Sequence, residues 1–323
     1  MTTPPCITEI PLDRVHLDAH PSTIVKEEDL ARLKESLATV GLLSPPRVRP
    51  LDDGWWQPAT GWKRLKAASL LGWSTIPAVV LEPETPEVHL LLLYLHDNAF
   101  SRAFNPLEQA WLAQRLLAHW DRDTLVAKGL PLLGLPPAPA HLERLLAAAR
   151  LEKPWQELVA AETLALSAAA RLAAWAPPDR LAALPFLAAL PFSQSKQEEF
   201  LAGVEILARR EGMSRADILA GQELHQDLID PTLTLQERSE AVRRRLTERV
   251  SPRLTAARKT LAAGLERLGL KRHPRLRLKE PPAFEGPDFE LSLKFRDHRE
   301  LKDILQELVR LAGRPEFEAL LDI

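Results

Sequence analysis

The sequence has few of the residues that build covalent or metal-stabilised folds. Cys6 is its single cysteine, which excludes an intrachain disulfide framework and any zinc site built from several cysteines. The most apolar run, residues 88–95, is far shorter than a bilayer crossing requires. The first ten residues lack a basic start followed by an apolar core, so we expect no secretory signal. These absences favour a cytoplasmic protein in a reducing compartment.

The chain also lacks a strong charge of either sign. Its 42 Lys and Arg residues nearly balance 44 Asp and Glu residues, which gives a net charge of −2. Any affinity for nucleic acid must therefore come from local patches rather than from the whole molecule. A length of 323 residues with 46% hydrophobic residues predicts a folded protein of two or three domains.

Residues 1–100 have the pattern of a small α+β domain. Residues 7–17 alternate loosely and predict a strand, and residues 27–40 place apolar side chains on one helical face. Residues 42–60 predict a turn, a strand and a hairpin through Asp52, Asp53 and Gly54 into a second strand. Residues 86–99 fit either a strand or a buried helix.

The stretch 57–80 is the most informative part of this domain. It reads as a strand that ends at Gly61, a helix that Gly72 ends, and a second strand from Ile76. A glycine turn leading into a helix places backbone N–H groups and the positive end of the helix dipole at one point. Lys63 and Arg64 add two cations there. The stretch therefore indicates either a polyanion site or a basic helix start that faces water.

Residues 101–222 predict an all-helical domain. Asn105 has the form of an N-cap, with Pro106 at the first helical position and the acidic Glu108 close behind, and this helix is expected to run to about residue 120. Two short helices at residues 124–132 and 140–151, joined by a turn at residues 133–135, match a helix-turn-helix outline. From these residues alone, an ordinary helical hairpin is favoured.

Residues 223–323 predict a long helix followed by a ββα unit. The helix spans residues 236–270 with an interruption at Ser251 and Pro252, and it has a local excess of five positive charges. Arg243, Arg244 and Arg245 stand at its centre. They fit a solvated helix face or a contact with phosphates. Strands at residues 275–280 and 289–295 with helices at 299–311 and 315–321 predict a dimerisation unit or a closing domain.

Several stretches in order resemble the ParB family, the centromere-binding proteins of bacterial chromosome and plasmid partition. The resemblance covers residues 7–120 well and residues 121–220 weakly. It rests on an Ile-Pro-Leu start, a helix–turn–strand over residues 30–50, a glycine-basic box and an Asn-Pro-x-Glu-x-Ala stretch. The matching positions include Ile10, Pro11, Leu12, Gly41, Pro45, Gly61, Lys63, Arg64, Ala67, Asp97, Asn98, Arg102, Asn105, Pro106, Glu108 and Ala110.

The resemblance implies a ParB/sulfiredoxin-like nucleotide-binding fold that binds CTP with magnesium. Carried across by position, Gly61, Lys63 and Arg64 would bind the phosphates, and Arg102 would also contact the nucleotide. Ser44 and Pro45 would line the nucleotide, and Asp97 and Asn98 would approach the metal. Mg²⁺ prefers such oxygen ligands. Three positions differ from the family's pattern, since Trp62 replaces a glutamate, Lys63 replaces an arginine and Asp97 replaces a glutamate.

The resemblance also implies a helix-turn-helix at residues 124–151, which is degenerate here. Pro136, Pro137 and Pro139 occupy the start of the expected recognition helix, whose exposed side chains are His141, Glu143 and Arg144. His141 and Arg144 are the candidates for DNA contact there, because base and phosphate contacts favour polar donors and cations. DNA contact can instead fall to Arg243, Arg244 and Arg245 in the C-terminal basic helix.

Three functions remain open from the sequence. The first is a nucleoid-associated DNA-binding partition protein, a homodimer with a ParA-type ATPase as partner and a CTP-dependent clamp that slow CTP hydrolysis resets. The second is an enzyme on the same fold, kinase-like with Asp97 as base or nuclease-like with Asp52 and Asp53. A sulfiredoxin activity is not favoured, because its chemistry needs a cysteine in the glycine-basic box, where this sequence has Trp62 and Lys63. The third is a DNA-independent assembly or regulatory factor.

Overall fold

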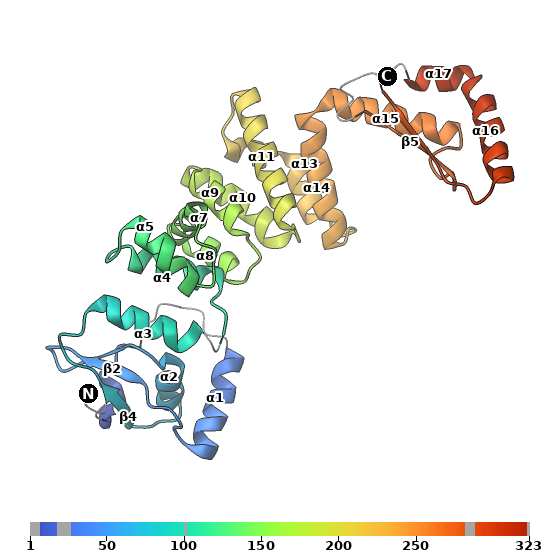
Figure 1. The fold of residues 1–323 in the computed structure, drawn as a ribbon. Helices are drawn as coiled ribbons and strands as arrows, with labels where there is room; N and C mark the ends of the chain where they lie inside the picture. The colour runs from blue at the N-terminus through green and yellow to red at the C-terminus, as the bar shows by residue number, and fades with distance from the viewer. Residues whose placement is uncertain (1–6, 18–26, 100–101, 282–287, 322–323) are drawn as a thin grey trace. The chain divides into compact units, whose positions relative to one another are not determined.

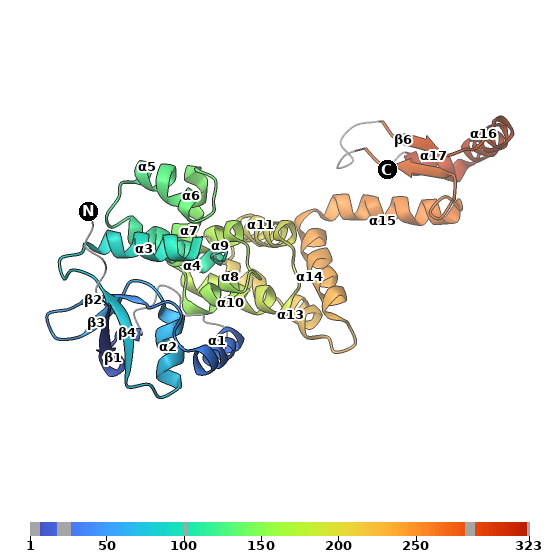
Figure 2. The same ribbon diagram turned by 60° about the horizontal axis from the view of Figure 1, so that its bottom comes forward.

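A computed structural model of the chain describes residues 7–17, 27–99, 102–281 and 288–321 (Figures 1 and 2). The chain forms two compact units, Met1–Leu201 and Ala202–Ile323. The mixed N-terminal part followed by helices confirms the predicted α+β class. The three domains expected at residues 1–100, 101–222 and 223–323 stay a prediction, and Cys6 lies outside the described residues. Within those ranges, no helix combines the length and apolar character that a membrane crossing needs.

The first unit begins with a four-stranded mixed sheet. Its strands are β1 (Ile7–Pro11), β2 (Arg47–Pro50), β3 (Trp56–Pro58) and β4 (Thr75–Val80). They lie in the order β1-β4-β2-β3, and only the β2–β4 pair is parallel. The predicted strand over residues 7–17 is shorter than expected, because the chain turns into a 3₁₀ helix at Leu12–Arg14. The predicted hairpin is confirmed, with Gly54 at φ 79° in its turn.

Three helices accompany this sheet: α1 (Glu27–Val40), α2 (Trp62–Leu70) and α3 (Glu87–Ala99). α1 and α2 pack against each other and bury the apolar face of the sheet. The resulting core contains Ile10, Leu30, Leu37, Val48, Leu65, Ala67, Ala68, Ile76 and Ala78. Residues 86–99 fitted either a strand or a helix from the sequence, and the structure shows that they form the helix α3. The short glycine turn between β3 and α2 is therefore held on a packed core.

The rest of the first unit is helical. α4 (Pro106–Leu116) begins with the predicted cap, in which Asn105 and Glu108 form a reciprocal capping box. α4 ends at Leu116 rather than near residue 120, because Asp121 caps the next short helix. The further helices are α5 (Arg122–Thr124), α6 (Leu130–Leu132), α7 (Pro139–Ala149), α8 (Lys153–Ala160), α9 (Leu166–Ala173) and α10 (Pro177–Ala189), with a π-helical turn at Leu125–Gly129.

α11 (Gln194–Glu211) leads the chain into the second unit. The elements that follow are α12 (Arg215–Leu219), α13 (Gln222–Ile229), α14 (Leu235–Val250), α15 (Pro252–Arg267), β5 (Leu276–Lys279), β6 (Glu290–Leu293), α16 (His298–Ala312) and α17 (Pro315–Leu321). The predicted interruption at Ser251 and Pro252 separates α14 from α15. β5 and β6 pair antiparallel, and Leu261, Leu276, Ile304, Leu311 and Leu320 belong to the core of the C-terminal part.

Candidate functional site

The turn between β3 and α2 forms the first side of the candidate site. Gly61 has φ 76°, and a Cβ atom placed on it would lie 2.8 Å from the Cβ atom of Pro46. Both the left-handed conformation and this close approach require glycine. α2 begins at Trp62, so Lys63 and Arg64 lie in its first turn at the positive end of the helix dipole. The predicted glycine-basic turn is thus confirmed as a structure.

Arg64 connects three of the predicted site residues. Its Nη1 donates a hydrogen bond to the backbone carbonyl of Ser44, and its Nη2 lies 3.5 Å from Asp97 Oδ2. Pro45 follows Ser44 on the same loop. Both side chains of the Arg64–Asp97 pair are partly exposed, 21% and 43%, and an ion pair of this kind contributes about 0–1 kcal/mol. An incoming anion can therefore replace Asp97 as the partner of Arg64 at low cost.

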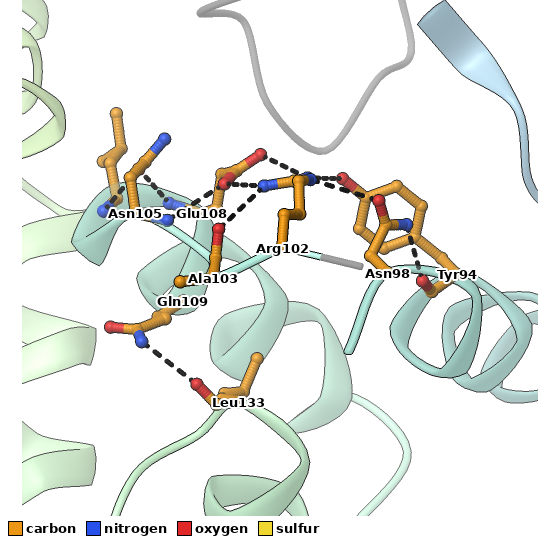
Figure 3. Close-up of polar contacts among 9 residues, drawn as sticks. Tyr94, Asn98, Arg102, Ala103, Asn105, Glu108, Gln109 and Leu133 are labelled. Atoms are coloured by element: carbon orange, nitrogen blue, oxygen red, sulfur yellow. Dashed lines mark hydrogen bonds and ion pairs between the residues drawn. The ribbon is translucent and has the colours of Figure 1, made fainter. Parts of the chain in front are cut away.

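Arg102 lies at the centre of a polar cluster between α3 and α4 (Figure 3). Its Nη1 and Nη2 donate to the two carboxylate oxygens of Glu108 at 2.7 and 2.9 Å. Nε donates to Asn98 Oδ1 at 3.1 Å, and Nη2 also donates to the Tyr94 hydroxyl at 3.1 Å. Glu108 is only 4% exposed. The pair is therefore bidentate, with a buried carboxylate and a guanidinium side chain that is 28% exposed, and its charge-assisted hydrogen bonds are strong.

The charges in this cluster affect the pKa values of its members. Burial lowers the pKa of Arg102, but the hydrogen bond and charge of Glu108 outweigh burial and raise it above the ordinary value. Burial, with a further contribution from the charge of Glu108, raises the pKa of Tyr94 to about 12. At neutral pH Arg102 is therefore charged and Tyr94 is a neutral hydrogen-bonding group.

The two predicted magnesium ligands differ in their suitability. Asn98 Nδ2 donates to the backbone carbonyl of Tyr94 at 2.8 Å, while Asn98 Oδ1 accepts from Arg102. A guanidinium beside Asn98 Oδ1 disfavours a divalent cation there. Asp97 presents a hard carboxylate oxygen, and Mg²⁺ commonly takes one or two protein ligands and obtains the rest from phosphate and water. In the described part of the chain, no group of three or more Asp, Glu, His or Cys residues is arranged to hold a metal ion.

The prolines at residues 136–139 do not prevent the formation of the expected turn and the helix that follows it. Gly134 has φ 78° in the turn before α7, and Pro139 occupies the first position of α7, where a missing N–H costs nothing. His141 Nδ1 lies 3.2 Å from the carbonyl oxygen of Pro136, and Arg144 is exposed. Glu143, which also lies on α7, forms an ion pair with Arg122 of α5. The DNA-binding roles of His141 and Arg144 stay predictions.

The three predicted arginines of α14 have different surroundings. Arg245 Nε lies 2.6 Å from Asp227 Oδ2, and its Nη1 lies 2.9 Å from Glu223 Oε2, both on α13. The hydrogen bonds to Asp227 raise the pKa of Arg245 above its ordinary value. Arg244 is exposed, and Arg243 is half-buried. A phosphate would have to displace two carboxylates from Arg245, so Arg244 is the more accessible of these two cations. A DNA-binding role for all three stays a prediction.

Sequence reasoning missed a second network, centred on Glu87 at the start of α3. Glu87 Oε2 accepts from Arg49 Nη2 at 3.2 Å and from Gln57 Nε2 at 3.1 Å, and Glu87 Oε1 pairs with Arg115. These side chains come from β2, β3 and α4, and no sequence spacing links them. Tyr94 was also missed. Its position four residues before Asn98 would have placed both on one helical face once residues 86–99 were taken as a helix.

Comparison with known proteins identifies the N-terminal part. Residues 4–99 match the ParB N-terminal domain. Over 144 residues the chain is 31% identical to the chromosome-partitioning protein ParB of Myxococcus xanthus, covering 40% of this chain and 47% of that protein. Over 95 residues it is 37% identical to the stage 0 sporulation protein J of Bacillus subtilis, covering 29% and 33%. The chain therefore spans between a third and a half of these relatives' lengths.

A further relative is the nucleoid occlusion protein of Geobacillus thermodenitrificans, 32% identical over 104 residues, which cover 31% of this chain and 35% of that protein. Among solved structures, C-terminally truncated ParB from Caulobacter crescentus in complex with the centromeric parS site is 21% identical to this chain, with a TM-score of 0.34. The match covers 66% of this chain and 97% of that chain. The curated relatives and the matched domain agree with one another. Residues 4–99 of this chain therefore carry a ParB N-terminal domain.

Proposed function

We propose that this chain is a DNA-binding partition protein whose N-terminal domain binds CTP with Mg²⁺ as a switch. The observation that carries the proposal is the convergence of Ser44, Gly61, Arg64 and Asp97, which come from three separate segments of the chain. The ParB N-terminal domain match suggests the nucleotide class, since the ParB resemblance implies CTP. This convergence supports a site for a polyanionic ligand.

Each side chain has a chemical role in this proposal. The Gly61 turn and the α2 N-terminus receive the phosphates, and Lys63 and Arg64 offset their charge. Asp97 would hold Mg²⁺ together with phosphate oxygens. Trp62, which stands where the family has a glutamate, is 7% exposed and lines a small cavity with Tyr94. Its indole therefore contributes packing beneath the turn rather than a ligand.

The partners follow from the C-terminal part and from the family. Leu305 and Val309 are exposed on α16 at a spacing of one helical turn, and Phe295 is exposed just before that helix. An apolar face of this kind supports the predicted homodimer. DNA would be bound through cations such as Arg144 and Arg244, which would place the protein on the nucleoid. A ParA-type ATPase as a partner rests on the family resemblance.

Calorimetric titration with CTP, ATP and GTP, each with Mg²⁺ and with or without mixed duplex DNA, tests this function. Selective binding of CTP with an affinity that DNA alters is the expected result. DNA binding without any nucleotide binding would contradict the nucleotide site. Selective binding of ATP would instead favour the kinase-like enzyme with Asp97 as base.

A second candidate function is a DNA-independent assembly or regulatory factor. One observation favours it, because two carboxylates on α13, those of Asp227 and Glu223, already pair with Arg245. These ion pairs reduce the positive charge that α14 can offer to DNA. Binding of CTP with no binding to any duplex at low salt would select this function over the partition protein.

A further inference from the structure

We infer that Arg102 is a positioning residue that joins the candidate nucleotide site to the helix-turn-helix-like segment. This inference rests on the proposed function, because it assigns a route by which that site communicates. The route starts beside Asp97, passes through the Arg102–Glu108 pair into the first turn of α4, and reaches the turn before α7 through Gln109 (Figure 3).

The hydrogen bonds of Arg102 argue against a direct contact with phosphates. Its Nη1 and Nη2 bind the two oxygens of Glu108, and its Nε binds Asn98. Moving this guanidinium to a nucleotide would leave the buried Glu108 carboxylate without its cation, which is a costly state. Arg64 has no such obligation, since its carboxylate partner is exposed and 3.5 Å away. Arg102 therefore acts through Asn98 and Glu108 rather than on the ligand.

The far side of the route is also held by hydrogen bonds. Glu108 Oε2 accepts from the backbone N–H of Asn105 at 3.0 Å, so the same carboxylate caps α4 and binds Arg102. The next residue, Gln109, donates through Nε2 to the carbonyl oxygen of Leu133 at 3.0 Å. Leu133 lies in the turn before α7, and α4 packs against α7. A change at Asn98 therefore has a continuous path of contacts to α7.

The first experiment compares the CTP affinities of Arg102→Gln and Glu108→Gln. Glutamine at position 108 keeps an acceptor for the capping box but loses the charge that holds Arg102. Positioning predicts that both variants weaken CTP binding by a similar factor, because each releases Asn98. A direct phosphate contact predicts a loss of about tenfold or more for Arg102→Gln, with unchanged or tighter binding for Glu108→Gln. That second pattern would overturn the inference.

The second experiment measures how CTP changes affinity for mixed duplex DNA. Gln109→Ala removes the hydrogen bond to Leu133 and is expected to keep CTP affinity while reducing the effect of CTP on DNA affinity. Arg115→Gln is the matched control, because it breaks an arginine–glutamate pair at the other end of α3. An effect of CTP that persists in Gln109→Ala, or that disappears equally in Arg115→Gln, would contradict the route.

Hydrogen exchange on the ligand-free protein separates this inference from the proposed function. If the wild-type protein binds no nucleotide, the proposed function fails, whereas the connection between α3 and α4 remains measurable. Arg102→Gln and Glu108→Gln should each increase exchange in the last turn of α3 and the first turn of α4 together. An increase confined to α4 would show that Glu108 only caps its own helix and would refute the connection.

Discussion

Two arginine–carboxylate pairs at the same end of α3 have opposite properties. Arg64 and Asp97 meet at 3.5 Å with both side chains partly exposed, while Arg102 binds Glu108 through two hydrogen bonds and Glu108 is buried. An exposed pair is worth little and is easily exchanged, whereas breaking a buried pair leaves an uncompensated charge. We therefore expect that Arg64 can exchange Asp97 for a ligand, whereas Arg102 stabilises the connection between α3 and α4.

The largest expected effect tests the buried pair. Glu108→Ala removes the partner of Arg102 and the acceptor that caps α4, so the free energy of unfolding should fall by about 3 kcal/mol. Denaturant titration measures this change. Asp97→Ala is the matched control, and it should lower the free energy of unfolding by less than about 1 kcal/mol. Equal losses in the two variants would remove the distinction between the pairs.

The next largest effect is a pH dependence of stability through Tyr94. Its pKa is about 12 in the folded protein against 10.0 for the unperturbed group, chiefly through burial and then through the charge of Glu108. Between these values the unfolded chain has lost the proton and the folded protein retains it. Stability should therefore fall as pH rises through this window, by about 1.4 kcal/mol per pH unit.

Tyr94 is the single tyrosine of the chain, so phenolate absorbance reports its titration without interference from another tyrosine. Denaturant titrations across the same window measure the stability. Tyr94→Phe should remove this contribution to the slope. A phenolate titration near pH 10 in the folded protein would mean that the hydroxyl lies outside the cluster.

The sequence predicted the secondary-structure elements of the candidate nucleotide site well, because local signals determine these elements. The glycine turn at Gly61 and the helix N-cap at Asn105 depend on a few neighbouring residues, and the structure confirms both. The convergence of Ser44, Arg64 and Asp97 was expected only from the family resemblance. No periodicity in the sequence links positions on three separate segments.

The pairing of side chains could not be predicted from the sequence. The sequence analysis named both Arg102 and Glu108, but nothing in the residues between them indicated that the Arg102 guanidinium would bind the carboxylate that caps α4. The same holds for Arg245, which looked equivalent to Arg244 in a basic run but meets Asp227 of α13. Tertiary contacts decide which cation of a run stays accessible, and charge patterning alone does not reveal them.

A smaller effect is expected when the exposed pair is broken. Arg64→Ala should weaken CTP binding by about 1.5–3 kcal/mol, the usual worth of a hydrogen bond to a charged group. Its free energy of unfolding should change by less than about 1 kcal/mol. Calorimetry with CTP and Mg²⁺ measures the first quantity and denaturant titration the second. An unchanged CTP affinity would remove Arg64 from the site and with it the proposed meaning of its loose pairing.

The smallest effect extends the comparison to α14. Arg244→Glu removes an exposed cation, so the salt dependence of DNA binding should become shallower by about one unit of slope while stability is kept. Arg245→Glu places a third acid beside Asp227 and Glu223 and should mainly destabilise the second unit, with its DNA effect following the loss of folded protein. Binding measured over a salt series on folded protein distinguishes the two. If Arg245→Glu flattens the salt dependence as much as Arg244→Glu in fully folded protein, then a tightly paired arginine does contact phosphate. The rule that pairing separates structural from ligand-binding arginines would then fail in this chain.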